Sequence, residues 1–489
     1  MKVWPLIFLF CAAALAAISN QSLWIDEATT AWQAGLPTLK ACWNQMIHDR
    51  GSELQMPLFM AYLWAWEKWI GSSEWLLRLS NLPWLLLGFG ALLNALSELK
   101  KLRFGIFVVA ALSPFLWFYL NEARPYIMQL GGTFLILAAL CRLNSGLELS
   151  HASQRLWSAG LGAGMFLVCG SNLLGVIWLS AALASSLFIL GPKRIWKWVK
   201  PFPVLWSVTF LAMLGLGVYF AWTLSLGARA SGAAGTDFKN LLFVGYEFLG
   251  FSGLGPGRLE IRDNGLIALR PYAGILGIYA VVLGGVLWMA WRERGKFASQ
   301  KILFWSAFFL AGAAASLLAL GFLAHFRVLG RHFSPLIVAV LVWLGFGLAQ
   351  LLNRPGAIPR ILAALFIGFN LVSCLSLRLA DRHRKDDYRG AAEIAKAASS
   401  SGKTVWWNAD RFSALFYKVP IRSEISQGNV ILINNVAANS LPDAPPDVVL
   451  VSKPDVYDSQ NAVGQFLKNA KYLQRSTLPA FSVWERPTH

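Results

Sequence analysis

Charged residues and cysteines are scarce in this chain, and this scarcity narrows the class of protein. Of the 489 residues, 14% are charged and 56% are hydrophobic, with a mean hydropathy of +0.52. Soluble globular proteins contain about 25% charged residues, so the composition indicates a polytopic membrane protein. The five cysteines include no C-x-x-C pair, and they support neither a disulfide framework nor a thiolate metal site.

Acidic residues are also few, and 43 Lys and Arg against 25 Asp and Glu leave a net charge of +18. In a soluble chain this excess would suggest a nucleic-acid partner. Here the basic residues fall mostly in short clusters between apolar runs, as topology signals do. No G-x-G-x-x-G or Walker motif opens a helix after a strand. We therefore expect membrane lipids as partners and no nucleic acid.

Apolar runs of about 20 residues recur along the chain and predict roughly eleven membrane-spanning helices. These runs are 3–19, 80–98, 104–121, 125–142, 157–171, 173–190, 202–223, 272–291, 302–324, 333–352 and 360–379. The first run could also be a signal peptide, because small residues end it. We favour a retained helix, since further spans follow it.

Clusters of Lys and Arg set the expected orientation. They lie at 100–103, 193–200, 292–296 and 354–360. All four fall on one side of the membrane only if the N-terminus is cytoplasmic and the stretch 57–70 does not cross. That stretch, PLFMAYLWAWEKWI, is about 14 residues long and contains Glu67 and Lys68. It predicts an amphipathic helix on the outer surface.

The resulting topology divides the chain into two expected domains. Residues 1–379 form a transmembrane domain whose outer segments are 20–79, 121–124, 224–271 and 325–332. After residue 379, helical patterns alternate with short apolar strands such as NVILINN and PDVVLVSK. We therefore expect residues 380–489 to form a small α/β domain outside the cytoplasm.

Ionisable residues gather in the outer segments, close to the ends of spans. They are Asp26, Glu27, Glu122, Arg124, Arg327, Arg331 and His332. Charges this near to hydrocarbon cost on the order of several kcal/mol unless they are paired or functional. They could simply tie helix ends together. They could also catalyse group transfer, because a carboxylate can deprotonate an acceptor while Arg and His hold a departing phosphate. ATP is absent outside the cell, so a lipid phosphate ester would be the activated donor.

Several short stretches carry a family resemblance. LWIDEATT, NEARPYIM and MPLFMAYLWAWEKWIGSSEWLLRLSNLP are the most specific, and GRHFSPL and KDDYRGAA add to them. They resemble motifs of the GT-C class of membrane glycosyltransferases, in particular bacterial glycosyltransferase family 39. Protein O-mannosyltransferases and lipid A aminoarabinose transferases are relatives of this family. The resemblance implies a membrane all-α fold, a GT-C-type bundle with a small C-terminal α/β domain, in the bacterial plasma (inner) membrane.

The same resemblance assigns roles to the acidic residues. Asp26 would be the general base that deprotonates the acceptor, and Glu27 would assist or orient it. Glu122 would position the acceptor or the sugar. In some relatives such acids approach a divalent cation, so Mg²⁺ or Mn²⁺ is a candidate cofactor whose ligands stay open.

The resemblance also implies a donor site. Arg124 and Tyr126 would line the donor cavity, while Arg331, with Arg327 or His332, would bind the polyprenyl phosphate. The donor would be a polyprenyl-phosphate monosaccharide, and the sugar would be transferred with inversion.

One departure from the family leaves the acceptor open. The family often has His-Pro-Pro-Leu-Tyr where this chain has QMPLF at 55–59, and His48 lies nearby as a further candidate substrate residue. The acceptor could be a glycan, a lipid or a protein. A non-catalytic scaffold and a transporter of lipid-linked sugars also remain open. A transporter predicts charges near span midpoints and repeated halves, and the sequence has almost no such charges and no such repeat.

Overall fold

The computed structural model describes residues 3–145, 149–227, 238–296, 300–323, 325, 328–422 and 428–487. The chain divides into two compact units. The helical unit comprises Met1–Ser19, Thr38–Trp66 and Arg78–His383, and the α/β unit comprises Asn20–Pro37, Glu67–Leu77 and Arg384–His489. The division therefore groups two early segments with the C-terminal residues.

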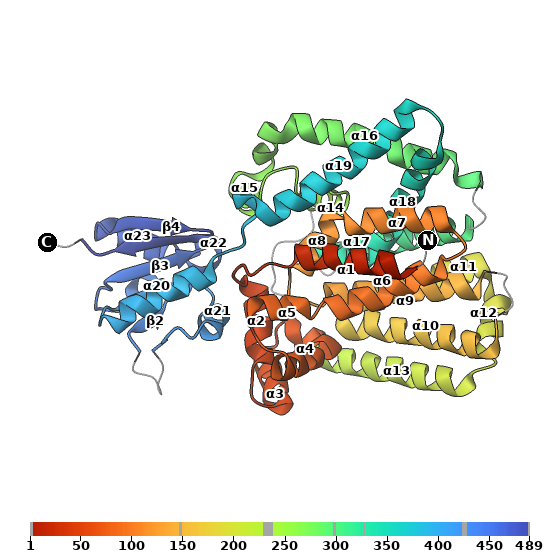
Figure 1. Ribbon diagram of the computed structural model, residues 1–489. Coiled ribbons are helices and arrows are strands. Elements are labelled where there is room, and N and C mark those ends of the chain that lie inside the picture. Colours follow the sequence, from red (N-terminus) through yellow and green to blue (C-terminus); the bar gives the residue numbers. More distant parts are fainter. Residues whose placement is uncertain are drawn as a thin grey trace. The chain divides into compact units, whose positions relative to one another are not determined.

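Helices that coincide with the predicted spans build most of the helical unit (Figure 1). They are α1 (Val3–Ala17), α6 (Leu82–Ala95), α7 (Lys100–Ala111), α8 (Pro114–Leu120), α9 (Tyr126–Leu143), α10 (His151–Ser171), α11 (Gly175–Leu190), α13 (Pro203–Ser225), α16 (Ala273–Arg292), α17 (Gln300–Leu323), α18 (Ile337–Asn353) and α19 (Ala357–Leu379). Each of the eleven predicted spans thus corresponds to a helix or to a bent pair of helices.

Length and composition allow seven helices in the described ranges to cross a membrane, or nine if each bent pair counts as one span. The bent pairs are α7 with α8, at 53°, and α11 with α12 (Pro192–Val199), at 110°. The two predicted spans outside this count are α1, which has 15 residues, and α10. The expected fold class, a helical membrane bundle with a small α/β region, is confirmed.

Shorter helices fill the connections between the spans. They are α3 (Leu39–Asp49), η1 (Ser52–Gln55), α4 (Pro57–Trp69), α5 (Glu74–Leu79), α14 (Phe238–Phe248), α15 (Arg258–Asn264), η2 (Gly265–Tyr272), η3 (Arg294–Lys296), η4 (Gly330–Leu336) and η5 (Asp381–His383). Helix α4 coincides with the predicted amphipathic stretch. The segment 224–271, one of the predicted outer segments, contains α14, α15 and part of η2, and its residues 228–237 lie outside the described ranges.

Proline and serine explain where several helices begin. Proline occupies the first turn of α6, α8, α12 and α13, where its fixed φ suits a helix and its missing N–H is not needed. Before α8, the Ser113 hydroxyl accepts a hydrogen bond from the Leu116 amide at 3.3 Å. This cap and Pro114 stop α7 from continuing straight, which accounts for the bend between α7 and α8.

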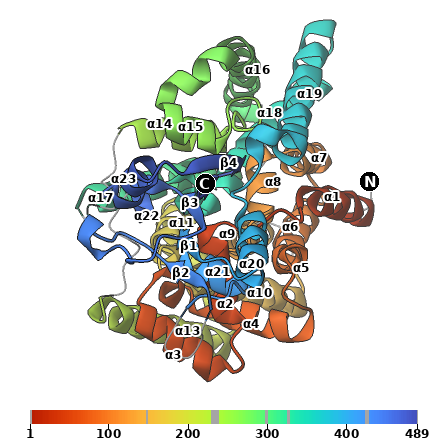
Figure 2. The ribbon, with the colours of Figure 1, turned by 90° about the vertical axis from the view of Figure 1, so that its left-hand side faces the viewer.

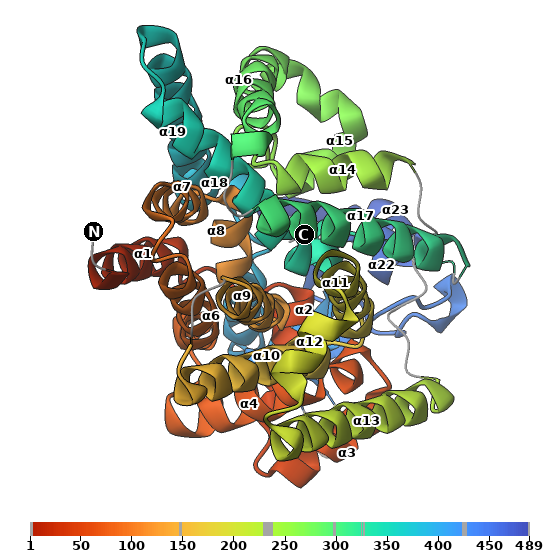
Figure 3. The same ribbon diagram turned by 90° about the vertical axis from the view of Figure 1, so that its right-hand side faces the viewer.

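Glycines let the central helices approach closely. A Cβ added to Gly88 of α6 would lie 2.2 Å from the Gly131 carbonyl of α9, and one on Gly105 of α7 would lie 2.1 Å from the Gly345 carbonyl of α18. In a lipid environment the hydrophobic effect does not drive helices together, so close van der Waals packing at small residues stabilises such crossings instead. Helix α9, buried over nearly its whole length, lies between α6 and α10 (Figure 3). Helix α13 by contrast is almost unburied.

A five-stranded sheet organises the α/β unit, in the order β2-β1-β3-β5-β4 (Figure 2). The strands are β1 (Val405–Asn408), β2 (Val430–Leu432), β3 (Val448–Ser452), β4 (Leu473–Leu478) and β5 (Phe481–Glu485). Strand β1 pairs in parallel with β2 and β3, while β5 pairs antiparallel with β3 and β4. The unit's helices are α2 (Ile25–Ala34), α20 (Tyr388–Ser400), α21 (Arg411–Phe416), α22 (Pro454–Tyr457), α23 (Ala462–Asn469) and η6 (Ala438–Ser440).

Both faces of this sheet are covered. Val405 and Trp407 of β1 pack with α20 on one face, while Trp406 packs with α23 on the other. Burial on two faces explains why β1 is a continuous apolar run. The predicted strands NVILINN and PDVVLVSK coincide with β2 and β3. The hairpin of β4 and β5 was not predicted, because the outer strand β4 is polar and largely exposed.

Candidate active site

The acidic pair Asp26 and Glu27 lies in the first turn of α2, in the α/β unit. Carboxylates in this position interact favourably with the helix dipole. Glu27 is fully buried, and its Oε2 accepts a hydrogen bond from Lys385 Nζ at 2.7 Å and a long one from the Trp24 amide at 3.4 Å. The carboxylate of Glu27 therefore fixes the start of α2, while Asp26 beside it is partly exposed.

Helix α2 packs against α21, which brings Asp26 close to polar residues of the sheet. The rings of Trp32 and Phe412 lie 5.2 Å apart. Asp410 caps α21 by accepting bonds from the amide and the hydroxyl of Ser413, at 2.6 and 2.8 Å. Burial raises the pKa of Asp410, and the nearby charge of Asp26 raises it further, against the lowering effects of Ser413 and of Lys453.

Further polar groups lie where the parallel strands β1 and β3 end. Asp410 follows β1, and Lys453 follows β3 in a left-handed conformation with φ 46°. Lys453 Nζ donates a hydrogen bond to Asp386. Burial raises the pKa of Tyr457, and the charges of Asp410, Asp26 and Asp386 raise it further. Ligand sites are common at the carboxyl ends of parallel strands where the strand order changes. We call the following five residues the strand-end cluster: Asp26, Asp386, Asp410, Lys453 and Tyr457.

In the helical unit, Glu122 and Arg124 lie in the tight turn between α8 and α9. Arg124 Nη1 donates to Glu53 Oε1 at 2.7 Å, and both side chains are buried. Glu122 is also buried, with its Oε1 3.7 Å from Arg258 Nη1. Arg258 in turn donates to Glu247 Oε1 at 2.9 Å. Three glutamates and two arginines thus form two ion-paired groups, Arg124 with Glu53 and Arg258 with Glu122 and Glu247, which we together call the turn network.

The remaining predicted residues have simpler surroundings. Arg331 and His332 lie in η4, which packs against α9 and α14. His332 Nδ1 accepts a bond from the Leu329 amide at 3.1 Å, and a Cβ on Gly330 would overlap Glu247. Tyr126 is buried at the start of α9. His48 is exposed at the end of α3, and Arg327 lies outside the described residues.

The turn network joins the predicted Glu122 and Arg124 with residues that the sequence analysis missed, namely Glu53, Glu247 and Arg258. Their only sequence signal is a charge in a segment between spans. The sequence analysis also missed Asp386, Asp410, Lys453 and Tyr457, although Lys453 directly follows the apolar strand β3 and Asp410 lies two residues after β1.

These acids do not fit a divalent cation site. Among the residues that the structure describes, no three His, Cys, Asp or Glu side chains are grouped as metal ligands. The three glutamates of the turn network face arginines instead. The candidate cofactor Mg²⁺ or Mn²⁺ therefore enters no step below.

The chain has the GT-C fold, which is the fold of membrane glycosyltransferases. The structure of ArnT from Cupriavidus metallidurans in the apo state matches with a TM-score of 0.57 at 13% identity, over 99% of this chain and 98% of that chain. The structure of the same protein bound to undecaprenyl phosphate matches with a TM-score of 0.55 and the same identity and coverage. The expected GT-C resemblance is confirmed at the level of the fold.

A third solved structure is similar over less of its own length. The Archaeoglobus fulgidus oligosaccharyltransferase, in a complex with Zn and sulfate, matches with a TM-score of 0.48 at 12% identity, over 87% of this chain and 58% of that chain. No protein-family profile matches the chain, and no curated protein matches it in sequence. The likeness therefore concerns the fold alone.

Proposed function

We propose that this protein is an inverting membrane glycosyltransferase that moves a monosaccharide from a polyprenyl-phosphate donor to a glycan, lipid or protein acceptor outside the cytoplasm. The turn network is the observation that carries the proposal. Five charged groups clustered between spans are costly near hydrocarbon, which favours a functional reason for keeping them. The undecaprenyl phosphate bound by ArnT, which has the same fold, is the chemical precedent for the donor.

In the proposed reaction, Asp26 is the general base. It accepts the proton of the acceptor hydroxyl as the acceptor oxygen bonds to the anomeric carbon. The bond between that carbon and the phosphate oxygen breaks, and polyprenyl phosphate leaves with its electron pair. Glu27, held by Lys385, keeps the start of α2 in place. Glu122 orients the sugar or the acceptor.

Cationic and aromatic residues complete the proposed site. Arg124 and Tyr126 line the donor cavity, and His48 contacts the acceptor. Charge on the departing phosphate is stabilised by Arg331, with Arg327 or His332. A guanidinium suits this task because its planar fork matches phosphate oxygens.

The proposed location is the bacterial plasma (inner) membrane, with the N-terminus in the cytoplasm and residues 380–489 outside. The start of α1 lies at one end of the helical bundle (Figure 1). That end also carries Lys100 and Lys101 at the start of α7, the basic helix α12, and Arg292 at the end of α16. Such clusters mark cytoplasmic loops. Asp26, at the other end of α1, is then outside, where the acceptor is found.

Turnover by purified protein in nanodiscs tests this proposal. A panel of radiolabelled polyprenyl-phosphate sugars is supplied with cell-envelope extract as acceptor, and release of polyprenyl phosphate is measured. We expect Asp26→Asn to lower turnover by about 10²- to 10⁴-fold. Asp443→Asn, which changes an exposed carboxylate of the same unit, is the matched control and keeps full turnover.

Two outcomes contradict the proposal. Equal turnover by the wild type and Asp26→Asn removes Asp26 as the base. Absence of turnover by the wild type with every donor favours the scaffold, or the transporter if labelled donor crosses the membrane instead.

A further inference from the structure

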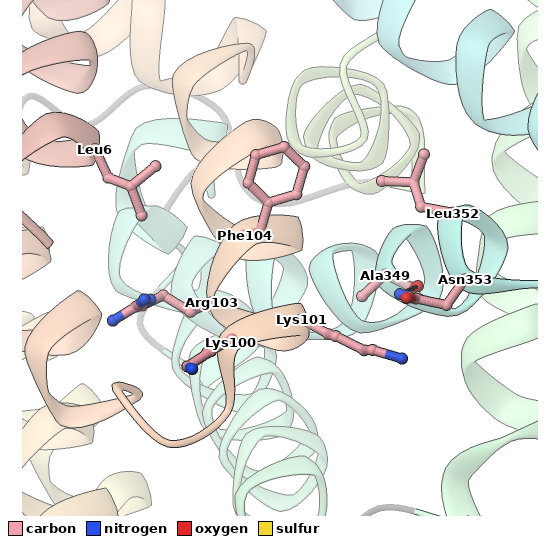
Figure 4. A pocket seen from close by; sticks show the side chains of 8 residues that line it. All are labelled: Leu6, Lys100, Lys101, Arg103, Phe104, Ala349, Leu352 and Asn353. Atoms are coloured by element: carbon pink, nitrogen blue, oxygen red, sulfur yellow. Dashed lines mark hydrogen bonds between the residues drawn. The ribbon is translucent and has the colours of Figure 1, made fainter. Parts of the chain in front are cut away.

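A basic pocket lies at the end of the helical unit opposite the turn network. It is lined by Leu6, Lys100, Lys101, Arg103, Phe104, Ala349, Leu352 and Asn353, and its volume is about 420 Å³. These residues come from α1, α7 and α18, as Figure 4 shows. Since α8 continues from α7 and ends at Leu120, just before Glu122, the pocket and the turn network occupy opposite ends of this bent span.

The pocket lies at a membrane surface, because its lining residues are at the ends of three helices. Helices α1 and α7 begin beside it, and α18 ends there. The loops at this end of the bundle carry the Lys and Arg clusters, which mark the cytoplasmic side. A ligand of the pocket would therefore reach it from the inner leaflet.

The lining combines positive charge with apolar surface. The first turn of α7 contains three cations of the pocket, Lys100, Lys101 and Arg103. No acidic side chain is among the described lining residues. Arg103 is only 3% exposed. Phe104 and Leu352, both about 40% exposed, belong to the same pocket. A free phosphate would use only the cations, whereas a phospholipid would use both kinds of surface.

The walls of the pocket are held firmly. The close approach of Gly105 to Gly345 joins α7 and α18 near the pocket, and α7 also packs against α1. Asn353 Nδ2 donates to the Ala349 carbonyl at 2.5 Å, within the last turn of α18. A preformed site of this kind lowers the entropy cost of ordering a ligand.

We propose that this pocket binds the phosphate-bearing headgroup of an anionic phospholipid of the inner leaflet. The exposed Lys100 and Lys101 face the phosphate, and Phe104 and Leu352 face the adjoining acyl chain. Basic pockets between membrane helices on the cytoplasmic side are suited to such headgroups. The inference rests on the pocket and on the proposed orientation of the helices, and it does not depend on the proposed glycosyltransferase activity.

Lipid binding by the full chain in detergent, measured by native mass spectrometry, tests this inference. The probes are short-chain phosphatidylglycerol and phosphatidylcholine. We expect the wild type to prefer phosphatidylglycerol, and the double variant Lys100→Ala/Lys101→Ala to bind it roughly tenfold more weakly. Lys100→Arg/Lys101→Arg should bind as the wild type does.

The matched control is Arg155→Ala/Arg360→Ala. It removes the same charge from exposed positions at the same end of the bundle, outside this pocket. An equal loss of binding in the control would overturn the inference, because general attraction to positive charge would then suffice. Equal affinity for phosphatidylcholine would also overturn it. Displacement of phosphatidylglycerol by inorganic phosphate at the same concentration as the lipid would also overturn the inference. All four substituted side chains are exposed, so thermal unfolding should not change in either variant.

Discussion

At the scale of single residues, the two acids that begin α2 have different surroundings although they are neighbours in sequence. Glu27 is fully buried against Lys385, while Asp26 is a partly exposed member of the strand-end cluster. A buried ion pair holds a position well, because losing one partner leaves an uncompensated charge. This difference supports a positioning role for Glu27 and leaves Asp26 as the accessible carboxylate.

The Glu27–Lys385 pair should be essential for the stability of the α/β unit. We expect Lys385→Met to destabilise it by about 3–5 kcal/mol, since Glu27 stays buried and charged. The double variant Glu27→Gln/Lys385→Met should recover part of this loss. Thermal unfolding measures both effects. The control Arg475→Met breaks an exposed pair with Glu485 and should cost less than about 1 kcal/mol; equal losses would refute the prediction.

Glu67 should make the α/β unit less stable as the pH rises from 4.5 to 8. Burial raises its pKa from 4.5 to about 8, although Lys68 opposes the shift. The folded state therefore binds the proton more tightly than the unfolded state, and this contribution to stability is complete below pH 4.5. It is lost as the pH rises through 8. Thermal unfolding from pH 5 to 9 should show the decline.

Glu67→Gln tests the cause of this pH dependence. The amide does not titrate, so the variant should lose the part of the decline that falls between pH 4.5 and 8. An unchanged pH profile in the variant would assign the decline to another group.

At the scale of elements, glycine contacts decide how closely helices cross. We expect Gly105→Ala to separate α7 from α18 and to cost about 1–3 kcal/mol, because its Cβ would lie 2.1 Å from a backbone oxygen. Gly215→Ala in α13 is the control, since nothing lies within 4 Å of that Cβ. The midpoint of thermal unfolding should fall only for Gly105→Ala, and a fall in both would contradict the packing argument.

Helices and buried strands were predictable from local patterns, but polar and short elements were not. Apolar runs predict the spans because hydropathy is a property of consecutive residues. The outer strand β4, with the residues LQRSTL, has no apolar alternation and is held by its pairing with β5. The segment 224–271 contains the short helices α14 and α15, which were not predicted from the sequence.

At the scale of the whole molecule, the proposed orientation can be tested by labelling cysteines. Four native cysteines are buried and Cys11 is partly buried, so background labelling should be low. A membrane-impermeant maleimide applied to spheroplasts should label Lys403→Cys, in the α/β unit. It should label Arg155→Cys, at the start of α10, only after the membrane is permeabilised. The reverse pattern would invert the topology.

Consecutive residues by themselves determined the membrane class, the positions of the long apolar helices, and the acids and arginines between them, because hydropathy and charge are local properties. Only the tertiary structure decided how these residues pair. Arg124 meets Glu53, 71 positions away, and Glu27 meets Lys385, 358 positions away. A buried charge needs an opposite charge beside it. Tertiary packing decides which part of the chain supplies that partner. The basic pocket likewise exists only because α1, α7 and α18 pack together.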